Sequence, residues 1–237
     1  MRKLIIYISV SCLAILLTSF SWAPPTQERT AVIKINLVDS LQSISDKASS
    51  LYNGLNLEEK GLSKEAFEYA YKGYEKLLKE NLVCHPGYLT ICDFSQSSKN
   101  KRLYLIDIAN NTIVLNTYVA HGRNSGGEYA TKFSNKLSSR QSSLGFYITK
   151  NTYRGENGLS LRMEGLDAGF NDRAYQRAIV IHGAGYIGDG SAGRSYGCPA
   201  VPLRESNTLI NTIKNGTCLF IYHPSTKYLR GSKILNG

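Results

Sequence analysis

The spacing of the apolar residues changes at Cys84, and this change divides the chain into a helix-forming part and a strand-forming part. Between residues 38 and 82, apolar side chains recur at steps of three and four residues, which places them on one face of a helix. Gly54 and Gly61 bracket a break between two predicted helices, and Ser63 is a suitable N-cap for the second. We expect its aromatic stripe to pack into a core.

After Cys84 the apolar pattern is typical of strands. Segments 102–108 and 112–120 are rich in β-branched and aromatic residues, and the Asn110-Asn111 pair between them indicates a hairpin. The other predicted strands cover residues 144–149, 159–164, 178–181 and 218–222, and one late helix is predicted over 203–214. We therefore predict a mainly β, largely antiparallel domain with one late helix, preceded by a small helical region. The fold class is α+β overall.

The first 25 residues have the layout of a secretory signal peptide. Arg2 and Lys3 precede an uncharged apolar run over residues 4–20, and Ser21-Trp22-Ala23 resembles a small-x-small cleavage site. A retained membrane anchor is the alternative, although a run of about 17 residues is at the short limit for a span. We expect cleavage, and no stable membrane span after it. The predicted organisation is a signal peptide over 1–23, a helical region over 24–84 and a strand-rich domain over 85–237.

The net charge is strongly positive. Loss of the first 23 residues would remove two positive charges and no acid, so that +10 becomes +8. The surplus is spread along the chain and accompanies no zinc finger or RNP motif, so we expect no nucleic-acid partner. Outside the cytoplasm a basic surface suits an anionic partner such as the cell wall or a membrane surface, and solubility alone is the alternative.

Four cysteines would remain in the exported chain: Cys84, Cys92, Cys198 and Cys218. Export permits disulfides, and Cys84 and Cys92 flank a short loop, so a local bridge and two separate thiols both stay open. Cys218 lies in an apolar strand and is expected in the core. No Cys-x-x-Cys or His-x-x-x-His spacing is present, so we expect no zinc site.

The segment 178–199 has the residues that suit nucleophilic catalysis. Four apolar residues lead to His182, Gly183 follows, and Cys198 comes sixteen positions after the histidine, at the end of a glycine-rich loop. This spacing allows the thiol and imidazole to meet, as a Cys–His pair requires. Gly197 permits a tight turn, and the N–H groups of Gly197 and Cys198 suit an oxyanion. The residues alone leave open that Cys198 is a core cysteine and His182 a loop histidine.

A strand, His182-Gly183, a loop and then Ser195-Tyr196-Gly197-Cys198 resemble the catalytic signature of the L,D-transpeptidases of YkuD-type fold. The pattern is more similar still to a branch of murein L,D-transpeptidase catalytic domains in which an aromatic residue precedes Gly-Cys-Pro. Segments 121–127 and 142–147 also resemble that branch. The resemblance extends over about residues 102–222, omits the helical region, and implies a β-sandwich-like domain.

This resemblance implies that Cys198 is a nucleophile acylated by a peptidoglycan tetrapeptide stem and that His182 is its base. The carbonyl of Gly183 would orient the imidazole. Ser195, Tyr196 and Gly197 would form the oxyanion and nucleophile loop, with no metal or cofactor. An amine from a second stem would give a 3–3 cross-link in the bacterial periplasm or cell envelope. The alternatives are an L,D-carboxypeptidase or endopeptidase on the same stems, and a catalytically silent peptidoglycan-binding module.

Two positions depart from the family pattern. Tyr196 stands where a second histidine is usual, and Ala200 where an arginine is often found. A different cation would then hold a substrate carboxylate, and Arg194 is the nearest in sequence, with Arg123 and Arg204 as alternatives.

His121, at the end of a predicted strand, is expected to line the cleft and position the stem. Its alternative role is to fix the adjacent loop through hydrogen bonds to the backbone.

Overall fold

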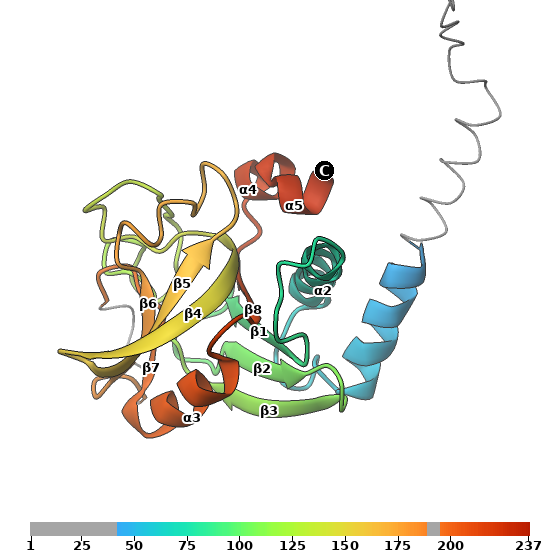
Figure 1. Cartoon of the computed structure of the whole chain (residues 1–237), viewed down its shortest axis with the longest axis horizontal. Helices are drawn as coiled ribbons and strands as arrows, with labels where there is room; N and C mark the ends of the chain where they lie inside the picture. Colours follow the sequence, from blue (N-terminus) through green and yellow to red (C-terminus); the bar gives the residue numbers. More distant parts are fainter. Residues whose placement is uncertain (1–41, 189–194) are drawn as a thin grey trace, which may run out of the picture. The chain divides into compact units, whose positions relative to one another are not determined.

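An eight-stranded mixed sheet forms the centre of the described structure, which comprises residues 42–188 and 195–237 of a computed structural model (Figure 1). The strands are β1 (Tyr88–Asp93), β2 (Leu103–Asp107), β3 (Thr112–Thr117), β4 (Gly145–Gly155), β5 (Gly158–Gly165), β6 (Val180–Ala184), β7 (Ala200–Pro202) and β8 (Cys218–Tyr222). Their order is β3-β2-β1-β8-β4-β5-β6-β7, with the β1–β8 and β6–β7 pairs parallel and the others antiparallel. The prediction of a mainly β, largely antiparallel fold is confirmed.

The helices lie before the sheet strands in sequence and after β7. Residues 42–54 form a first helix within the described part of the chain, and α2 (Lys64–Lys79) follows. The predicted start of the first helix, at residue 38, lies outside the described residues. The remaining helices are α3 (Leu203–Ile213), α4 (Thr226–Gly231) and α5 (Lys233–Asn236). The last two were not expected from the sequence, whereas α3 matches the predicted late helix.

The start of α2 is fixed by the residue that the sequence indicated. Ser63 has extended backbone angles, and its Oγ accepts a hydrogen bond from the N–H of Ala66 at 3.2 Å. This bond satisfies one of the backbone donors left free at a helix start. Asn81, just beyond the C-cap, has a left-handed φ of 56°, a conformation common after helix ends.

The aromatic face of α2 packs into the same core as the sheet. Its buried residues include Phe67, Tyr71 and Tyr74, which join the strand residues in one hydrophobic cluster. Gly73 lies directly over the ring of Phe146 in β4, and a Cβ at position 73 would stand 2.0 Å from Cζ of that ring. The absence of a side chain therefore allows the helix to approach the sheet, and the prediction that the stripe is core is confirmed.

The four cysteines between residues 42 and 188 and between 195 and 237 are free thiols. Cys84 is exposed while Cys92, in β1, is fully buried, so the local bridge left open by the sequence is not formed here. In the same described ranges, no helix is long and apolar enough to cross a membrane.

Candidate active site

The pairing of β6 with β7 brings His182 and Cys198 to the same end of the sheet. His182 is opposite Ala200 in parallel register, so Cys198 lies only two residues before the histidine's neighbour. The side chain of His182 is largely buried and that of Cys198 is partly exposed. His182 therefore lies at the centre of β6 and not at the strand end predicted from the sequence, and Cys198 lies two residues before β7.

The orientation of the His182 ring is set by the residue after it. Its Nδ1 lies 3.0 Å from the carbonyl oxygen of Gly183. Because a carbonyl only accepts, Nδ1 must carry the proton, and Nε2 of the neutral ring is left as a proton acceptor. A Cβ at Gly183 would lie 2.6 Å from Oγ of Ser206 in α3, so glycine allows β6 and α3 to pack closely here.

The Cys198 thiol is held in a mixed environment. Its Sγ donates to the carbonyl of Ala178 at 3.7 Å. Burial raises the pKa of the thiol, whereas a hydrogen bond from the backbone of Val180 and the positive charge of Arg177 act in the opposite direction. Because burial is the largest influence, the resting group is a thiol, and attack on a carbonyl requires a base to remove its proton.

The loop that carries Cys198 is fixed by hydrogen bonds on both sides. The N–H of Gly197 donates to Oγ of Ser195 at 3.1 Å, and the Gly197 carbonyl accepts from Oγ of Ser142 at 3.3 Å. Gly197 has a φ of 121°, and a Cβ there would stand 2.7 Å from the carbonyl oxygen of Gln141. The Gly197 N–H predicted to face an oxyanion is therefore already engaged, which leaves the N–H of Cys198 as the donor for that role.

His121 is not in the cleft. Its side chain is fully buried, with Nδ1 2.8 Å from Nη2 of Arg102 and Nε2 3.4 Å from the carbonyl of Gly126. Burial and the charge of Arg102 lower the pKa of His121 to about 4. The prediction that His121 contacts the substrate is wrong, because a side chain with no accessible surface holds its own loop instead.

The predicted substrate-binding arginines have different environments. Arg123 is exposed, and its guanidinium carbon lies 5.9 Å from the centre of the Tyr196 ring. Arg204 is exposed near the start of α3 and pairs with Glu205 at 3.3 Å. Arg194 lies outside the described residues. Of the two candidates that the structure describes, Arg123 is the one beside the nucleophile loop.

Arg177 is a member of the site that the sequence did not reveal. Its guanidinium donates to the carbonyls of Ser134 and Gln141 at 2.7 and 2.6 Å, and also to the hydroxyls of Ser139 and Ser143. It thereby ties the loop 134–143 to the segment that precedes β6. It lies in a run of turns without a periodic pattern, so no signal in the sequence distinguished it from other surface arginines.

Two hollows adjoin the Cys198 loop. One, of about 570 Å³, is lined mainly by polar residues, including Asn124, Arg140, Gln176, Arg177 and Tyr196, and no acidic residue is among the lining residues that the structure describes. The other, of about 240 Å³, includes Ala178, Val180, Tyr153 and Arg162 in its walls. Cys198 itself is not among the described residues that line either hollow, but Tyr196 lines the larger one, and Ala178, whose carbonyl accepts from the thiol, lines the smaller one.

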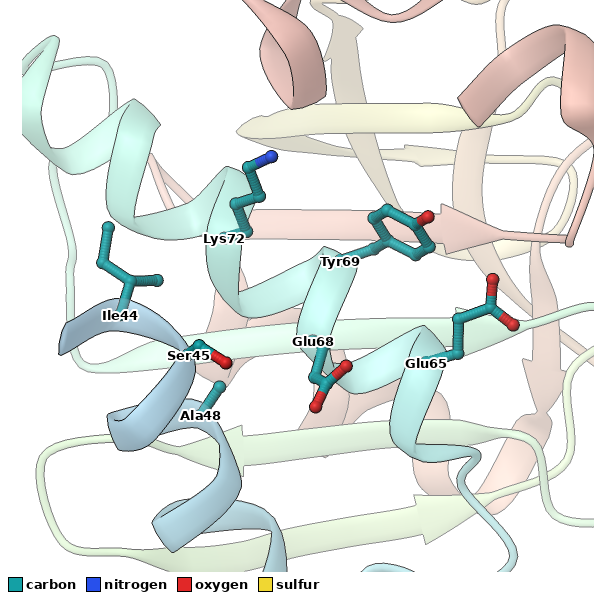
Figure 2. Close-up of a pocket in the computed structure, with 7 residues that line it drawn as sticks. All are labelled: Ile44, Ser45, Ala48, Glu65, Glu68, Tyr69 and Lys72. Atoms are coloured by element: carbon teal, nitrogen blue, oxygen red, sulfur yellow. The ribbon is translucent and has the colours of Figure 1, made fainter. Parts of the chain in front are cut away.

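A further pocket lies apart from these groups, between the helix over residues 42–54 and α2 (Figure 2). Figure 2 shows Ile44, Ser45 and Ala48 on one wall and α2 on the other. Its charged side chains are Glu65, Glu68 and Lys72, and it contains no histidine or cysteine. Among its described lining residues it therefore lacks a pair like that of Cys198 and His182.

A largely buried thiol with some accessible surface, an imidazole oriented by a carbonyl and a neighbouring backbone N–H define the class of acyl-transfer sites. The chain belongs to the family of L,D-transpeptidase catalytic domains, whose family model matches residues 58–222. The family predicted from the sequence is confirmed. The match begins well before residue 102 and includes α2, so it is longer than the resemblance found in the sequence.

Similar solved structures include L,D-transpeptidase 3 from Mycobacterium tuberculosis, with 10% identity, a TM-score of 0.39, and 58% of this chain and 61% of that chain covered. An L,D-transpeptidase from Stackebrandtia nassauensis has 10% identity and a TM-score of 0.38, with 68% of each chain covered. One from Xylanimonas cellulosilytica has 17% identity and a TM-score of 0.35, with 57% and 60% covered. The chain spans about three fifths of the length of most structures it matches. None of the curated proteins compared with the chain matches it.

Proposed function

We propose that the chain is a peptidoglycan L,D-transpeptidase that forms 3–3 cross-links through an acyl-enzyme on Cys198. The observation that carries this proposal is the parallel register of His182 with Ala200. Cys198 precedes Ala200 by two residues, so the register brings the thiol close to the strand that holds the oriented imidazole. Membership of the L,D-transpeptidase family supports the same reaction.

In the proposed reaction Nε2 of His182 takes the thiol proton, and the Cys198 sulfur attacks the carbonyl carbon of the third stem residue. The N–H of Cys198 donates to the oxyanion. As the intermediate collapses, the peptide bond to D-Ala breaks and His182 returns the proton to the leaving amine. An amine of a second stem then attacks the thioester and gives its proton to His182. The new amide bond forms, and the thiol is regenerated.

We further propose that the protein acts at the envelope of a bacterium, after export directed by residues 1–23. The apolar run and the cleavage pattern of the sequence support this location. The positive charge suits the anionic wall, and Arg123 is exposed beside the nucleophile loop, where it can contact a stem carboxylate.

The test is incubation of the purified protein with disaccharide-tetrapeptide, followed by mass spectrometry of the products. Cys198→Ala is the nucleophile variant, and Cys84→Ala is the matched control because Cys84 is an exposed thiol outside the site. We expect a cross-linked dimer lacking one D-Ala from the wild type and from Cys84→Ala, and none from Cys198→Ala.

Each other outcome points to a different activity. Tripeptide without dimer would show that water resolves the acyl-enzyme and would identify a carboxypeptidase. Intact substrate with all three proteins, together with no mass increase on exposure to a carbapenem, would overturn the catalytic proposal in favour of a silent wall-binding module.

A further inference from the structure

Two arginines from separate loops converge on one exposed tyrosine next to the nucleophile. The guanidinium carbon of Arg140 lies 5.0 Å from the centre of the Tyr196 ring, and that of Arg123 lies 5.9 Å from it. Tyr196 is 64% exposed and stands two residues before Cys198. We call Arg123, Arg140 and Tyr196 the arginine–tyrosine cluster.

The backbone fixes the three segments that supply this cluster. The N–H of Arg123 donates to the carbonyl of Ser195 at 2.8 Å, and the N–H of Asn124 donates to the carbonyl of Arg140 at 3.1 Å. The side chain of Asn124 also donates to the carbonyl of Ser139 at 3.0 Å. The arginines are therefore brought to the ring by loop geometry and not by ionic partners.

The cluster has an unbalanced positive charge. Within residues 42–188 and 195–237, no ion pair includes Arg123 or Arg140. Arg177 lines the same hollow as Arg140, and none of the described residues that line it is acidic. Cations gathered without an acid repel one another, and an anion placed among them relieves this repulsion. Both guanidinium groups contact the tyrosine ring, and a guanidinium in cation–π contact can still use its N–H edges to bind a ligand.

We infer that the arginine–tyrosine cluster binds a carboxylate of the peptide stem while Cys198 is being acylated. This inference rests on the proposed function. A planar guanidinium matches a carboxylate with two parallel hydrogen bonds, and the hydroxyl of Tyr196 adds a third donor. The cluster thus supplies the cation missing at Ala200, with Arg140 as the residue that both lines the hollow and contacts the ring.

The experiment measures acylation of Cys198 by intact-protein mass spectrometry, using tetrapeptide stems with free carboxylates and stems with each carboxylate amidated in turn. We expect one amidation to slow acylation of the wild type by roughly tenfold, the size expected for a charge-assisted hydrogen bond. Arg140→Gln should slow acylation by the free stem to the same degree. In this variant the free stem and the amidated stem should then acylate Cys198 at the same rate. Tyr196→Leu should slow acylation by the free stem to a smaller degree, because it removes the aromatic ring that both arginines contact.

Two variants serve as controls. Arg230→Gln removes the same charge from α4, outside the hollow, and should act as the wild type. Arg162→Gln disrupts another arginine–tyrosine contact, 4.2 Å from the ring of Tyr153, in the second hollow. The inference would be overturned if Arg162→Gln, but not Arg140→Gln, reacted equally fast with the free and the amidated stem.

Equal acylation by every stem in the wild type would also overturn it while leaving the proposed function intact. No acylation by any stem would remove the proposed function and the inference together.

Discussion

Arg102 donates a hydrogen bond at 2.8 Å to Nδ1 of His121, so two basic side chains are in contact inside the core. An arginine can only donate, and therefore His121 must be neutral, with its proton on Nε2 facing the carbonyl of Gly126. Arg102 is itself fully buried and also donates to the carbonyl of Val119. The loop that follows His121 thus depends on a histidine that remains unprotonated.

This contact predicts a stability that depends on pH. The pKa of His121 is lowered to about 4, so the fold gains stability from the neutral ring above about pH 6.5 and loses it as the pH falls towards 4. The full loss is about 3 kcal/mol. Urea unfolding at pH 7 and pH 4.5 should show a smaller loss for His121→Asn, which keeps an acceptor but does not titrate. An equal loss in both proteins would contradict the assignment.

Arg177 is predicted to lower the pKa of the Cys198 thiol. Its charge acts on the thiol, and it also holds the loop 134–143. In Arg177→Gln the pH midpoint for alkylation of Cys198, followed by peptide mass spectrometry, should rise by roughly one unit. Arg177→Lys keeps the charge and loses most of the hydrogen bonds, so its melting temperature should fall while its midpoint stays near that of the wild type. A midpoint unchanged in Arg177→Gln would assign Arg177 to a structural role alone.

Gly73→Ala is predicted to be destabilising although alanine favours helices. The new Cβ would overlap the ring of Phe146, and the forced shift should cost about 2 kcal/mol net in the free energy of unfolding. Gly54→Ala is the matched control: it lies in the helix over residues 42–54 with no neighbour within 4 Å, and should stabilise by up to about 1 kcal/mol. The double variant Gly73→Ala, Phe146→Leu should recover part of the loss.

The cysteines are predicted to react in two groups. Iodoacetamide should modify Cys84 and Cys198 in the folded protein, because both have accessible side chains, and Cys92 and Cys218 only after unfolding. Mass spectrometry with and without denaturant counts the modified sites. If Cys84 and Cys92 both resisted alkylation until a reductant was added, a disulfide would join them and the free-thiol state described here would be contradicted.

Much of the fold could be predicted because local patterns agree with it. Residues close together in the sequence determine three of its features: the apolar period of α2, the cap at Ser63 and the hairpin of β2 and β3. Strand β1 was missed because two of its buried residues, Thr90 and Asp93, are polar, so it has neither an unbroken apolar run nor the alternation that marks a half-exposed strand. Strand β7 has three residues and is too short for any period.

The same distinction between local patterns and long-range contacts separates the site residues that could be predicted from those that could not. Cys198, His182 and Gly183 come from one short stretch of chain, so motif and geometry coincide. Arg140 and Arg177 come from loops whose positions depend on long-range contacts, which no local pattern encodes. His121 was placed wrongly for the same reason, since its partner Arg102 is nineteen residues away in the sequence.

Strand β7, which follows Cys198, limits how the proposed peptide substrate can bind. β7 is the last strand of the sheet, yet Pro199 before it and Pro202 at its end have no N–H group. The N–H of Ala120 already donates to the carbonyl of Ala200 at 2.8 Å. The sheet therefore ends in an edge with little left to offer another backbone, which protects it from joining a second sheet. For the proposed peptide substrate, this edge is therefore poorly suited to binding as an extra strand. We expect the peptide to be recognised mainly by side chains.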